Sequence, residues 1–411
     1  MCGMKINFHQ SDLLTINIED KMAKSFPQIF SCKVGTFPIK YLGVPLHYDK
    51  LRREDLQPII DRIIRCISGW LGRHLTYKGK LILLCACIVS SPAYLMVVIK
   101  FPKWAIEAIN SQMAHSFWGN MGDQHKYHLT NWGLITRKKF FGGLGIPNLN
   151  EFNMALLASS GKRFFDNKKR LERCYSFKYN TEYPNVLWSK SDNASSFWKS
   201  VTWALNASKT FYRWKIGNGR NVKLWHDLWV GECSLKVQFR ELFYICNQPE
   251  CTVSRVWDGV DLKLSFRRCA DSTGFDKWNQ LLDIIQGIPL SDAPDVPIWM
   301  LESNGVYSVK SFHSTINFGG VASAIGDKLW KILCPQNIHV FLWLSVYNKV
   351  LTGDDLAKRK NVDDPSCLFC NELEYVQHLF FDCIVAKCIW KLFAKSFQMQ
   401  IMSCFKDICA L

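Results

Sequence analysis

Apolar side chains recur at helical spacing through the first 165 residues. After Arg53 one apolar stripe repeats about every 3.6 residues and Gly69 follows it, which predicts a helix ending there. The stripe consists of Ile59, Ile60, Ile63, Ile64 and Ile67. Another helix is predicted from Pro102, and its inner stripe consists of Ile106, Ile109, Met113 and Phe117. A further helix is predicted over residues 149–165, so this part of the chain should form a helical bundle.

Residues 81–99 form an uncharged apolar run that is long enough to span a membrane. Ser90, Ser91 and Pro92 lie near its centre, and a proline breaks or kinks a continuous helix. We therefore predict a helix that is buried on all sides as far as Ser90, followed by a short apolar segment. No membrane partner is expected.

The rest of the chain is less regular. Residues 37–46 contain two prolines and a glycine and should be extended and turn-rich. A helix near residues 327–351, broken at Pro335, has an apolar stripe of Leu329, Ile332, Leu333, Val340, Phe341 and Leu344. The predicted fold is mainly α in three parts: a basic helical region at 1–165, a Trp-rich mixed connector at 166–294, and a small α-rich domain at 295–411.

Charge and cysteine content narrow the class of protein. The net charge is +16, and residues 1–165 hold 21 Lys and Arg against 10 Asp and Glu, which suits a polyanionic partner such as RNA or DNA. A basic protein that is merely soluble is the alternative. The 17 cysteines are spread along the chain, and residues 1–20 lack the apolar core of a signal peptide. An intracellular protein, nuclear or cytoplasmic and not secreted, is expected.

The clearest chemical motif lies near the C-terminus. Cys367 and Cys370 are separated by two residues, His378 follows after seven more, and Cys383 after a further four. This Cys₃His spacing is typical of a structural zinc site without an open coordination position. Incidental residues and a redox pair are the alternatives, but Cys367 follows a turn rather than a buried strand. Cys383 also precedes a predicted helix with Val385, Ile389, Leu392 and Phe393 on one face, and helix N-termini stabilise thiolates.

Two groups of basic residues with aromatic neighbours are candidates for nucleic-acid contacts. The first contains Arg73, Lys78 and Lys80 beside Trp70 and Tyr77. The second contains Arg137, Lys138 and Lys139 beside Phe140 and Phe141. Such groups can follow a phosphate backbone and stack a base, although a solvated helix face would have the same composition.

Catalytic patterns are weak. Polymerases hold two metal ions with carboxylates in a turn between apolar strands. Asp354-Asp355 instead predicts a capped helix start, and Asp363-Asp364 precedes Pro365 in a turn. The glycine-rich residues 141–146 lack the Lys-Ser/Thr of a phosphate loop. The residues favour a binding protein over an enzyme.

Several motifs together resemble the reverse transcriptases of plant-type LINE (non-LTR) retrotransposons over nearly the whole chain. They are the segments 4–11, 37–46 (F-P-x-x-Y-L-G-x-P-L), 70–102, the Phe117-Trp118 pair, 142–146 (G-G-L-G-I), 214–219, 225–229 and 305–311, with 329–359 and the Cys₃His set after them. The resemblance implies a thumb-like bundle that follows a palm domain, a connector and a reverse-transcriptase zinc-binding domain whose ligands fall on Cys367, Cys370, His378 and Cys383.

The family copies RNA into DNA, but its palm aspartates, endonuclease and ribonuclease H have no counterpart in this sequence. The resemblance therefore implies a non-catalytic remnant that binds nucleic acid. A zinc-stabilised protein-interaction module and a decayed element product without a selected role are the alternatives.

Overall fold

The computed structural model describes residues 11–16, 18, 25–30, 32–41, 43–47, 51–69, 75–119, 127–166, 194–267, 272–317, 323–359 and 363–408. The chain divides into two compact units, Met1–Arg65 and Cys66–Leu411. The described residues are mainly helical and their strands are short, which confirms the predicted mainly α class. The division at residues 165/166 and 294/295 stays a prediction.

The first unit contains two small strand pairs. β1 (Asp12–Leu13) and β2 (Lys33–Val34) are parallel, and a short helix, α2 (Phe26–Phe30), lies between them in sequence. β3 (Ile39–Tyr41) and β4 (Val44–Leu46) form an antiparallel hairpin whose turn contains Gly43 at a positive φ of 83°. This hairpin confirms the extended, turn-rich prediction for residues 37–46.

Helix α3 (Arg53–Gly69) has the predicted bounds. Glu54 and Asp55 stand in its first turn, where the helix dipole favours acidic side chains, and Asp55 accepts a hydrogen bond from the backbone of Arg52 at 2.7 Å. Ile60, Ile63 and Ile67 of the predicted stripe are buried.

The second unit continues with a helical path through residues 77–96. Its parts are α4 (Tyr77–Leu83), the π-helical turn η2 (Leu84–Ile88) and α5 (Ser90–Met96). The prediction that the helix ends near Ser90 is wrong, because the chain stays helical through Pro92. The preceding turn is wider than an α-turn, with Val89 donating to the carbonyl of Leu84 at 3.2 Å, and Pro92 lies in the first turn of α5, where a proline is tolerated.

The prediction that this helix is buried on all sides is also wrong. Leu84, Leu95 and Met96 are buried, but Ile82 is 54% exposed and Tyr94 is 46% exposed. An apolar composition alone therefore misjudged one face of the helix. Residues Tyr77–Met96 are long and apolar enough to cross a membrane, and core helices of soluble proteins can have the same length and composition.

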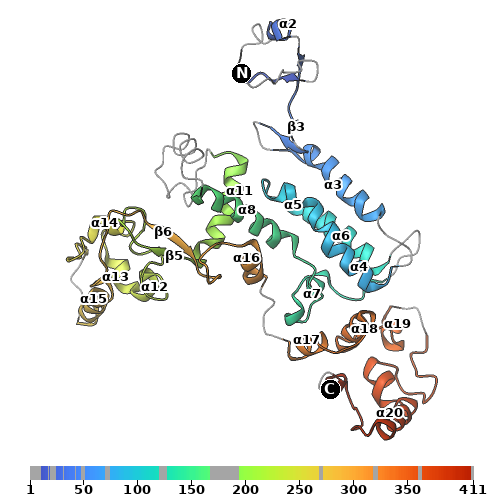
Figure 1. The fold of residues 1–411 in the computed structure, drawn as a ribbon. Helices are drawn as coiled ribbons and strands as arrows, with labels where there is room; N and C mark the ends of the chain where they lie inside the picture. Colours follow the sequence, from blue (N-terminus) through green and yellow to red (C-terminus); the bar gives the residue numbers. More distant parts are fainter. Residues whose placement is uncertain are drawn as a thin grey trace. The chain divides into compact units, whose positions relative to one another are not determined.

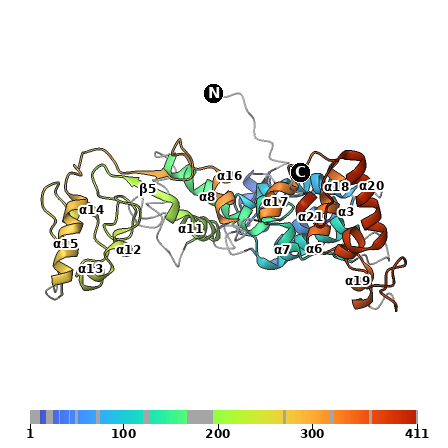
Figure 2. The same cartoon turned by 90° about the horizontal axis from the view of Figure 1, so that it is seen from below.

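A central helical core follows. It combines α6 (Lys103–Trp118), α7 (Trp132–Ile135), η3 (Lys139–Phe141), α8 (Leu149–Asp166), α11 (Ser196–Ser208), η4 (Lys209–Phe211) and α16 (Val309–Ile316). Helix α6 has the predicted buried stripe. In two views at right angles, α8, α11 and α16 lie together (Figure 1, Figure 2), and the core between them contains Trp198, Leu205, Trp299 and Phe312.

Buried polar side chains fix this core. Asn153 of α8 donates to the carbonyls of Met96 and Ile99 at 2.7 and 3.0 Å and accepts from the backbone of Phe101 at 2.9 Å. Tyr307 donates to the carbonyl of Ala155 at 2.7 Å. Because buried polar groups are costly without partners, these bonds select one arrangement of α5, α8 and the segment before α16.

The Trp-rich region forms a second core. β5 (Tyr212–Lys215) pairs antiparallel with β6 (Val296–Trp299), and the chain between them supplies short helices. These are α12 (Leu235–Gln238), α13 (Arg240–Ile245), α14 (Val253–Val256) and α15 (Ser272–Ile285). Four tryptophans are buried among these helices: Trp214, Trp225, Trp229 and Trp257. Their rings form the core and are therefore not exposed for contact with a ligand.

The C-terminal part consists of α17 (Ala324–Leu329), α18 (Gln336–Val346), α19 (Gly353–Lys358), the π-turn η5 (His378–Asp382), α20 (Ile384–Phe397) and α21 (Phe405–Ile408). Pro335 separates α17 from α18, as predicted. The inner position predicted for Leu333 is wrong, since its side chain is fully exposed. The loop before Pro335 resets the helical phase, so one stripe cannot run through both helices. Phe341 is likewise 42% exposed.

Candidate metal centre and basic surface

A tight hairpin presents the first two cysteines of the Cys₃His set. Ser366 pairs with Leu373 as an antiparallel bridge, and Cys367 donates its backbone N–H to the carbonyl of Glu372 at 2.7 Å. Asn371 closes the turn at a φ of 56°, a left-handed conformation that asparagine tolerates well. This turn allows the thiols of Cys367 and Cys370 to face a common point.

His378 and Cys383 stand at the two ends of η5. The backbone N–H of Cys383 donates to the carbonyl of His378 at 2.8 Å, which closes a wide i to i+5 turn. Such π-turns are rare and are frequent at functional sites. The turn directs both side chains towards the hairpin.

The four predicted ligands meet. Their donor atoms, one from each residue, all lie within 4.8 Å of one another. The Sγ atoms of Cys367 and Cys383 are 3.8 Å apart, and Sγ of Cys370 lies 3.1 Å from Nε2 of His378. A tetrahedral ion with sulfur ligands at ~2.3 Å needs ligand separations of roughly this size. Cys367, His378 and Cys383 are buried, and Cys370 is half-buried.

The surroundings of Cys383 suit a thiolate ligand. Burial opposes ionisation of Cys383, but backbone N–H groups of Val385 and Ala386 at the start of α20 leave its pKa below the ordinary value. The other ring nitrogen of the histidine, Nδ1 of His378, lies 3.4 Å from a carboxylate oxygen of Glu372. This contact is close enough for an ion pair but does not have hydrogen-bond geometry, so Glu372 supports the buried ring through its charge. The donor set and its surroundings therefore fit a zinc ion.

The predicted basic residues have different environments. Arg73 lies outside the described residues, and Arg137 is exposed. Lys138 donates to the hydroxyl of Ser314 at 2.7 Å and so joins α16 to the segment before η3. Lys80 lies 3.5 Å from the carbonyl of Phe117. Lys138 and Lys80 therefore also have packing contacts.

Lys78 and Lys139, from the two separate groups, line one hollow of about 70 Å³, named here the basic hollow. Its other lining residues are Leu81, Trp330, His339 and Val340. The Trp330 and His339 rings stack with centroids 5.7 Å apart, and Nζ of Lys139 lies 4.5 Å from the Trp330 ring. Sequence reasoning missed Trp330 and His339, because no local spacing connects them with Lys78.

The glycine-rich segment 142–146 joins this region to α18. The indole N–H of Trp343 donates to the carbonyl of Gly142 at 2.8 Å. A Cβ at Gly142 would lie 1.8 Å from the hydroxyl of Tyr347, and one at Gly143 would lie 2.1 Å from the carbonyl of Arg137. Glycines are therefore required here by close packing.

Comparison with known proteins agrees with this site. Residues 307–390 match the family described as zinc-binding in reverse transcriptase. A putative ribonuclease H protein of Arabidopsis thaliana is 24% identical over 361 residues, covering 84% of this chain and 57% of the relative, so the chain spans little more than half of that protein. An uncharacterized mitochondrial protein of Arabidopsis thaliana is 26% identical over 141 residues, covering 34% of this chain and 92% of the relative. These matches confirm the resemblance, and the chain is related to the C-terminal region of plant retrotransposon reverse transcriptases, with that family's zinc-binding domain at residues 307–390.

Proposed function

We propose that this chain is a non-catalytic, nucleic-acid-binding relative of a retrotransposon reverse transcriptase, and that a structural zinc ion stabilises its C-terminal domain. The observation that carries the proposal is the basic hollow, where Lys78 and Lys139 lie beside Trp330. Two cations at one aromatic-lined surface suit a phosphate backbone with unpaired bases. RNA or DNA is the proposed partner.

Zinc is the proposed cofactor, with Cys367, Cys370, His378 and Cys383 as its ligands. All four positions of a tetrahedral ion would be filled by side chains, so the ion would stabilise the fold and leave no position for a substrate. Coupling between zinc binding and folding is expected for such a small, cysteine-rich cluster. Free thiols are needed for this role, which is consistent with a reducing nuclear or cytoplasmic compartment.

The proposal of a non-catalytic chain rests on the two aspartate pairs. Asp354 accepts from Lys358 and Thr352 at 2.7 and 2.6 Å, and Asp364 accepts from the backbone of Ser366 at 2.9 Å. Both carboxylates serve local turns and helix starts. This arrangement differs from the strand-turn geometry in which polymerases hold two metal ions.

Salt-dependent binding of a labelled single-stranded RNA tests the nucleic-acid proposal. The full chain and the Lys78→Glu, Lys139→Glu variant are compared by fluorescence anisotropy at several salt concentrations. Each lost phosphate contact lowers the slope of log affinity against log salt by about 0.7, so a decrease of ~1.4 is expected.

A matched control separates the site from bulk charge. The variant Lys215→Glu, Lys310→Glu changes two exposed lysines elsewhere and alters the net charge equally. Its salt slope should stay close to that of the original chain. Equal losses in both variants, or no RNA and DNA binding by the original chain, would overturn the proposal.

Elemental analysis tests the zinc proposal separately. The full chain purified under reducing conditions should contain about one zinc per molecule, and Cys367→Ser with Cys370→Ser should contain none. Cys388→Ser is the control, because Cys388 is an exposed thiol outside the cluster. A folded original chain without zinc would refute the metal site.

A further inference from the structure

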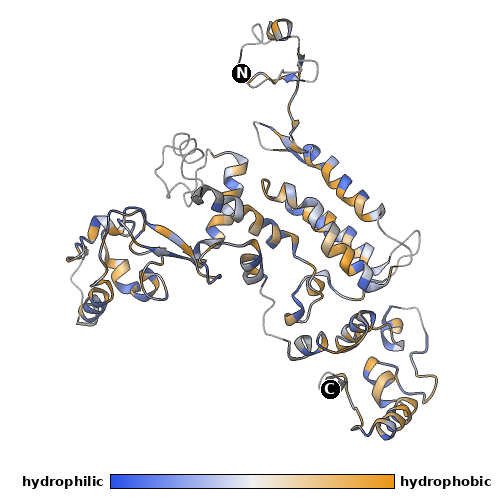
Figure 3. Cartoon of the chain, in the orientation of Figure 1, coloured by the Kyte–Doolittle hydropathy of each residue, from blue (hydrophilic) through white to orange (hydrophobic). Residues whose placement is uncertain are grey.

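Helix α20 leaves most of its apolar residues exposed. Its start covers the Cys₃His cluster through Ala386, the one residue of this helix that is buried. The apolar colour of α20 is visible in Figure 3. The large apolar side chains that solvent reaches are Ile384 (62% exposed), Ile389 (47%), Leu392 (66%), Phe393 (53%) and Phe397 (64%). An exposed apolar surface of this extent marks an interaction site.

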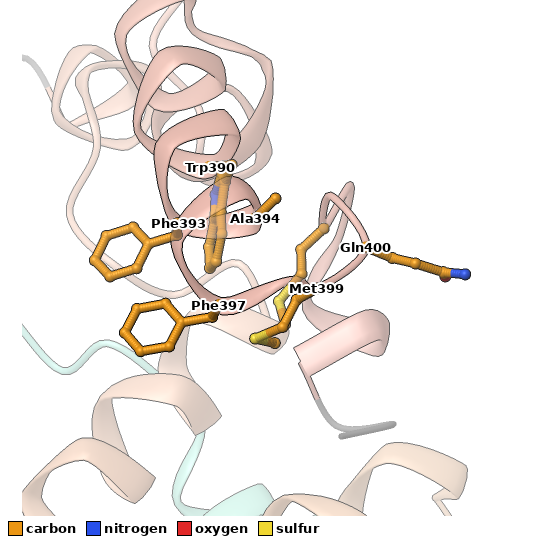
Figure 4. Close-up of a pocket in the computed structure, with 7 residues that line it drawn as sticks. Trp390, Phe393, Ala394, Phe397, Met399 and Gln400 are labelled. Atoms are coloured by element: carbon orange, nitrogen blue, oxygen red, sulfur yellow. The ribbon is translucent and has the colours of Figure 1, made fainter.

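The C-terminal end of α20 forms an apolar groove of about 360 Å³. Gln398 ends the helix in a left-handed conformation with a φ of 53°, so the chain turns back beside the helix. The residues that line the groove are Trp390, Phe393, Ala394, Phe397, Met399, Gln400 and Met402, and Figure 4 labels six of these, with the Gln400 side chain pointing away from the others.

Hydrogen bonds and ring stacking hold the groove in place. Gln377 donates to the carbonyl of Ser403 at 2.7 Å and so fixes the returning segment. Trp390 stacks on Phe381 with an interplanar angle of 3° and donates its indole N–H to the carbonyl of Phe380 at 2.7 Å. The aromatic wall is therefore preformed, while the methionines opposite can adapt to an incoming side chain.

A stripe of positive charge follows the same helix. Lys387, Lys391 and Lys395 are four residues apart, which places them in one row, and all three are exposed. Residues 384–397 contain no Asp or Glu. The surface of α20 thus combines an apolar face with a row of positive charge.

We propose that α20 binds an acidic amphipathic helix of a partner protein. Apolar side chains at i, i+3 or i+4, and i+7 of that helix would enter the groove beside Phe393 and Phe397, and its carboxylates would face the lysine row. A second copy of this chain is disfavoured, because pairing two α20 helices would bring two lysine rows together. Single-stranded nucleic acid is the competing occupant, because lysines beside aromatic rings also suit phosphates and stacked bases, and the experiment below separates it from an acidic helix.

A designed peptide tests the proposal on the full, zinc-loaded chain. The probe is a fluorescein-labelled helix of about 18 residues with Leu and Phe at the anchor positions and Glu on both flanks. The first control peptide has the same composition with scrambled anchors, and the second has Lys in place of every Glu. The acidic peptide should bind most tightly in fluorescence anisotropy.

Two variants locate the contact. Phe393→Ala with Phe397→Ala should weaken binding of the acidic peptide by about tenfold or more, as expected when exposed aromatic anchors are removed. Lys387→Glu, Lys391→Glu, Lys395→Glu should reverse the preference towards the basic peptide. Both variants should retain zinc and helical circular dichroism, because their changes lie on exposed or groove-lining positions.

Three outcomes would overturn the proposal. They are equal binding of the scrambled peptide, competition by single-stranded RNA that depends on the lysine row, and a chain that dimerises through this face. Dimerisation would be seen by analytical ultracentrifugation as a species that Phe397→Glu abolishes. Failure here leaves the RNA test of Lys78 and Lys139 unaffected, because that test uses a different surface.

Discussion

Asp295 should be among the most important residues for stability of the Trp-rich region. Its side chain is 5% exposed and accepts three backbone N–H groups, from Gly217 at 2.8 Å, Gly219 at 2.9 Å and Asn221 at 3.0 Å. These donors lie in the turn that follows β5, and Asp295 immediately precedes β6. One carboxylate therefore ties the turn to the partner strand.

The magnitude follows from the bonds that are lost. A hydrogen bond to a charged group contributes roughly 1.5–3 kcal/mol, and an unpaired buried N–H costs about 1–3 kcal/mol. The contributions are not additive, and the Asn221 bond is partly open to water. Asp295→Ala should therefore lower the free energy of unfolding by about 3–5 kcal/mol. Asp295→Asn keeps an oxygen for Gly217 and Gly219 but sets its amide against Asn221, so a loss of about 1–2 kcal/mol is expected.

Urea unfolding followed by tryptophan fluorescence measures both variants. Four buried tryptophans (Trp214, Trp225, Trp229 and Trp257) lie in the same core and report its unfolding directly. The expected order of stability is Asp, then Asn, then Ala. The reasoning is refuted if Ala costs less than about 1 kcal/mol, or if Asn and Ala cost the same, since the three bonds would then not act as described.

Three further predictions concern the central core. Burial raises the pKa of Glu151 to about 7 although Lys138 opposes this. The folded state then holds the Glu151 proton more tightly than the unfolded chain, so the free energy of unfolding should fall as pH rises from about 4.5 to 7. Glu151→Gln should remove this pH dependence and add about 1–2 kcal/mol of stability at pH 8, after allowance for the partial exposure of the side chain. Urea unfolding at several pH values measures both effects. Gly142→Ala, at a φ of 80° and against the hydroxyl of Tyr347, should lower the melting temperature, and Tyr347→Phe should partly restore it. Asn153→Ala removes three hydrogen bonds, two of them buried, and should cost about 2–4 kcal/mol in the same urea assay, whereas a neutral result would show that water replaces the side chain.

The sequence predicted those elements whose determinants are local. The stripes of α3 and α6 lie within single helices, so their bounds and buried faces agree with the structure. The predicted end near Ser90 was wrong because a π-turn leads directly into α5 with Pro92 in its first turn, and nothing in the residue pattern distinguishes a wide turn from a break. The inner position predicted for Leu333 was wrong because the predicted helical stripe was continued across Pro335, although Leu333 lies in the loop before it.

The two candidate sites also differ in how far their residues are separated along the sequence, and therefore in how well the sequence predicts them. The Cys₃His set has ligands within 17 residues of one another, so its spacing limits the geometry, and all four donor atoms meet. The basic hollow combines residues from α4, η3 and the α17–α18 region, which are far apart in sequence. Lys78 and Lys139 were recognised as basic residues, but their shared position beside Trp330 depends on tertiary packing.

The residues that match the zinc-binding family do not form a separately packed domain, because their first part packs against the helical core. Tyr307 and Phe312, within the matched residues 307–390, lie in the core with α8 and α11, and Tyr307 donates to Ala155. Further along, Trp343 of the same match donates to Gly142. The matched residues are thus anchored to the helical core at two points before the Cys₃His cluster begins. A fragment starting at residue 295 would keep the four ligands but expose the buried face of α16, so the folding of the zinc-binding domain is best measured in the full chain.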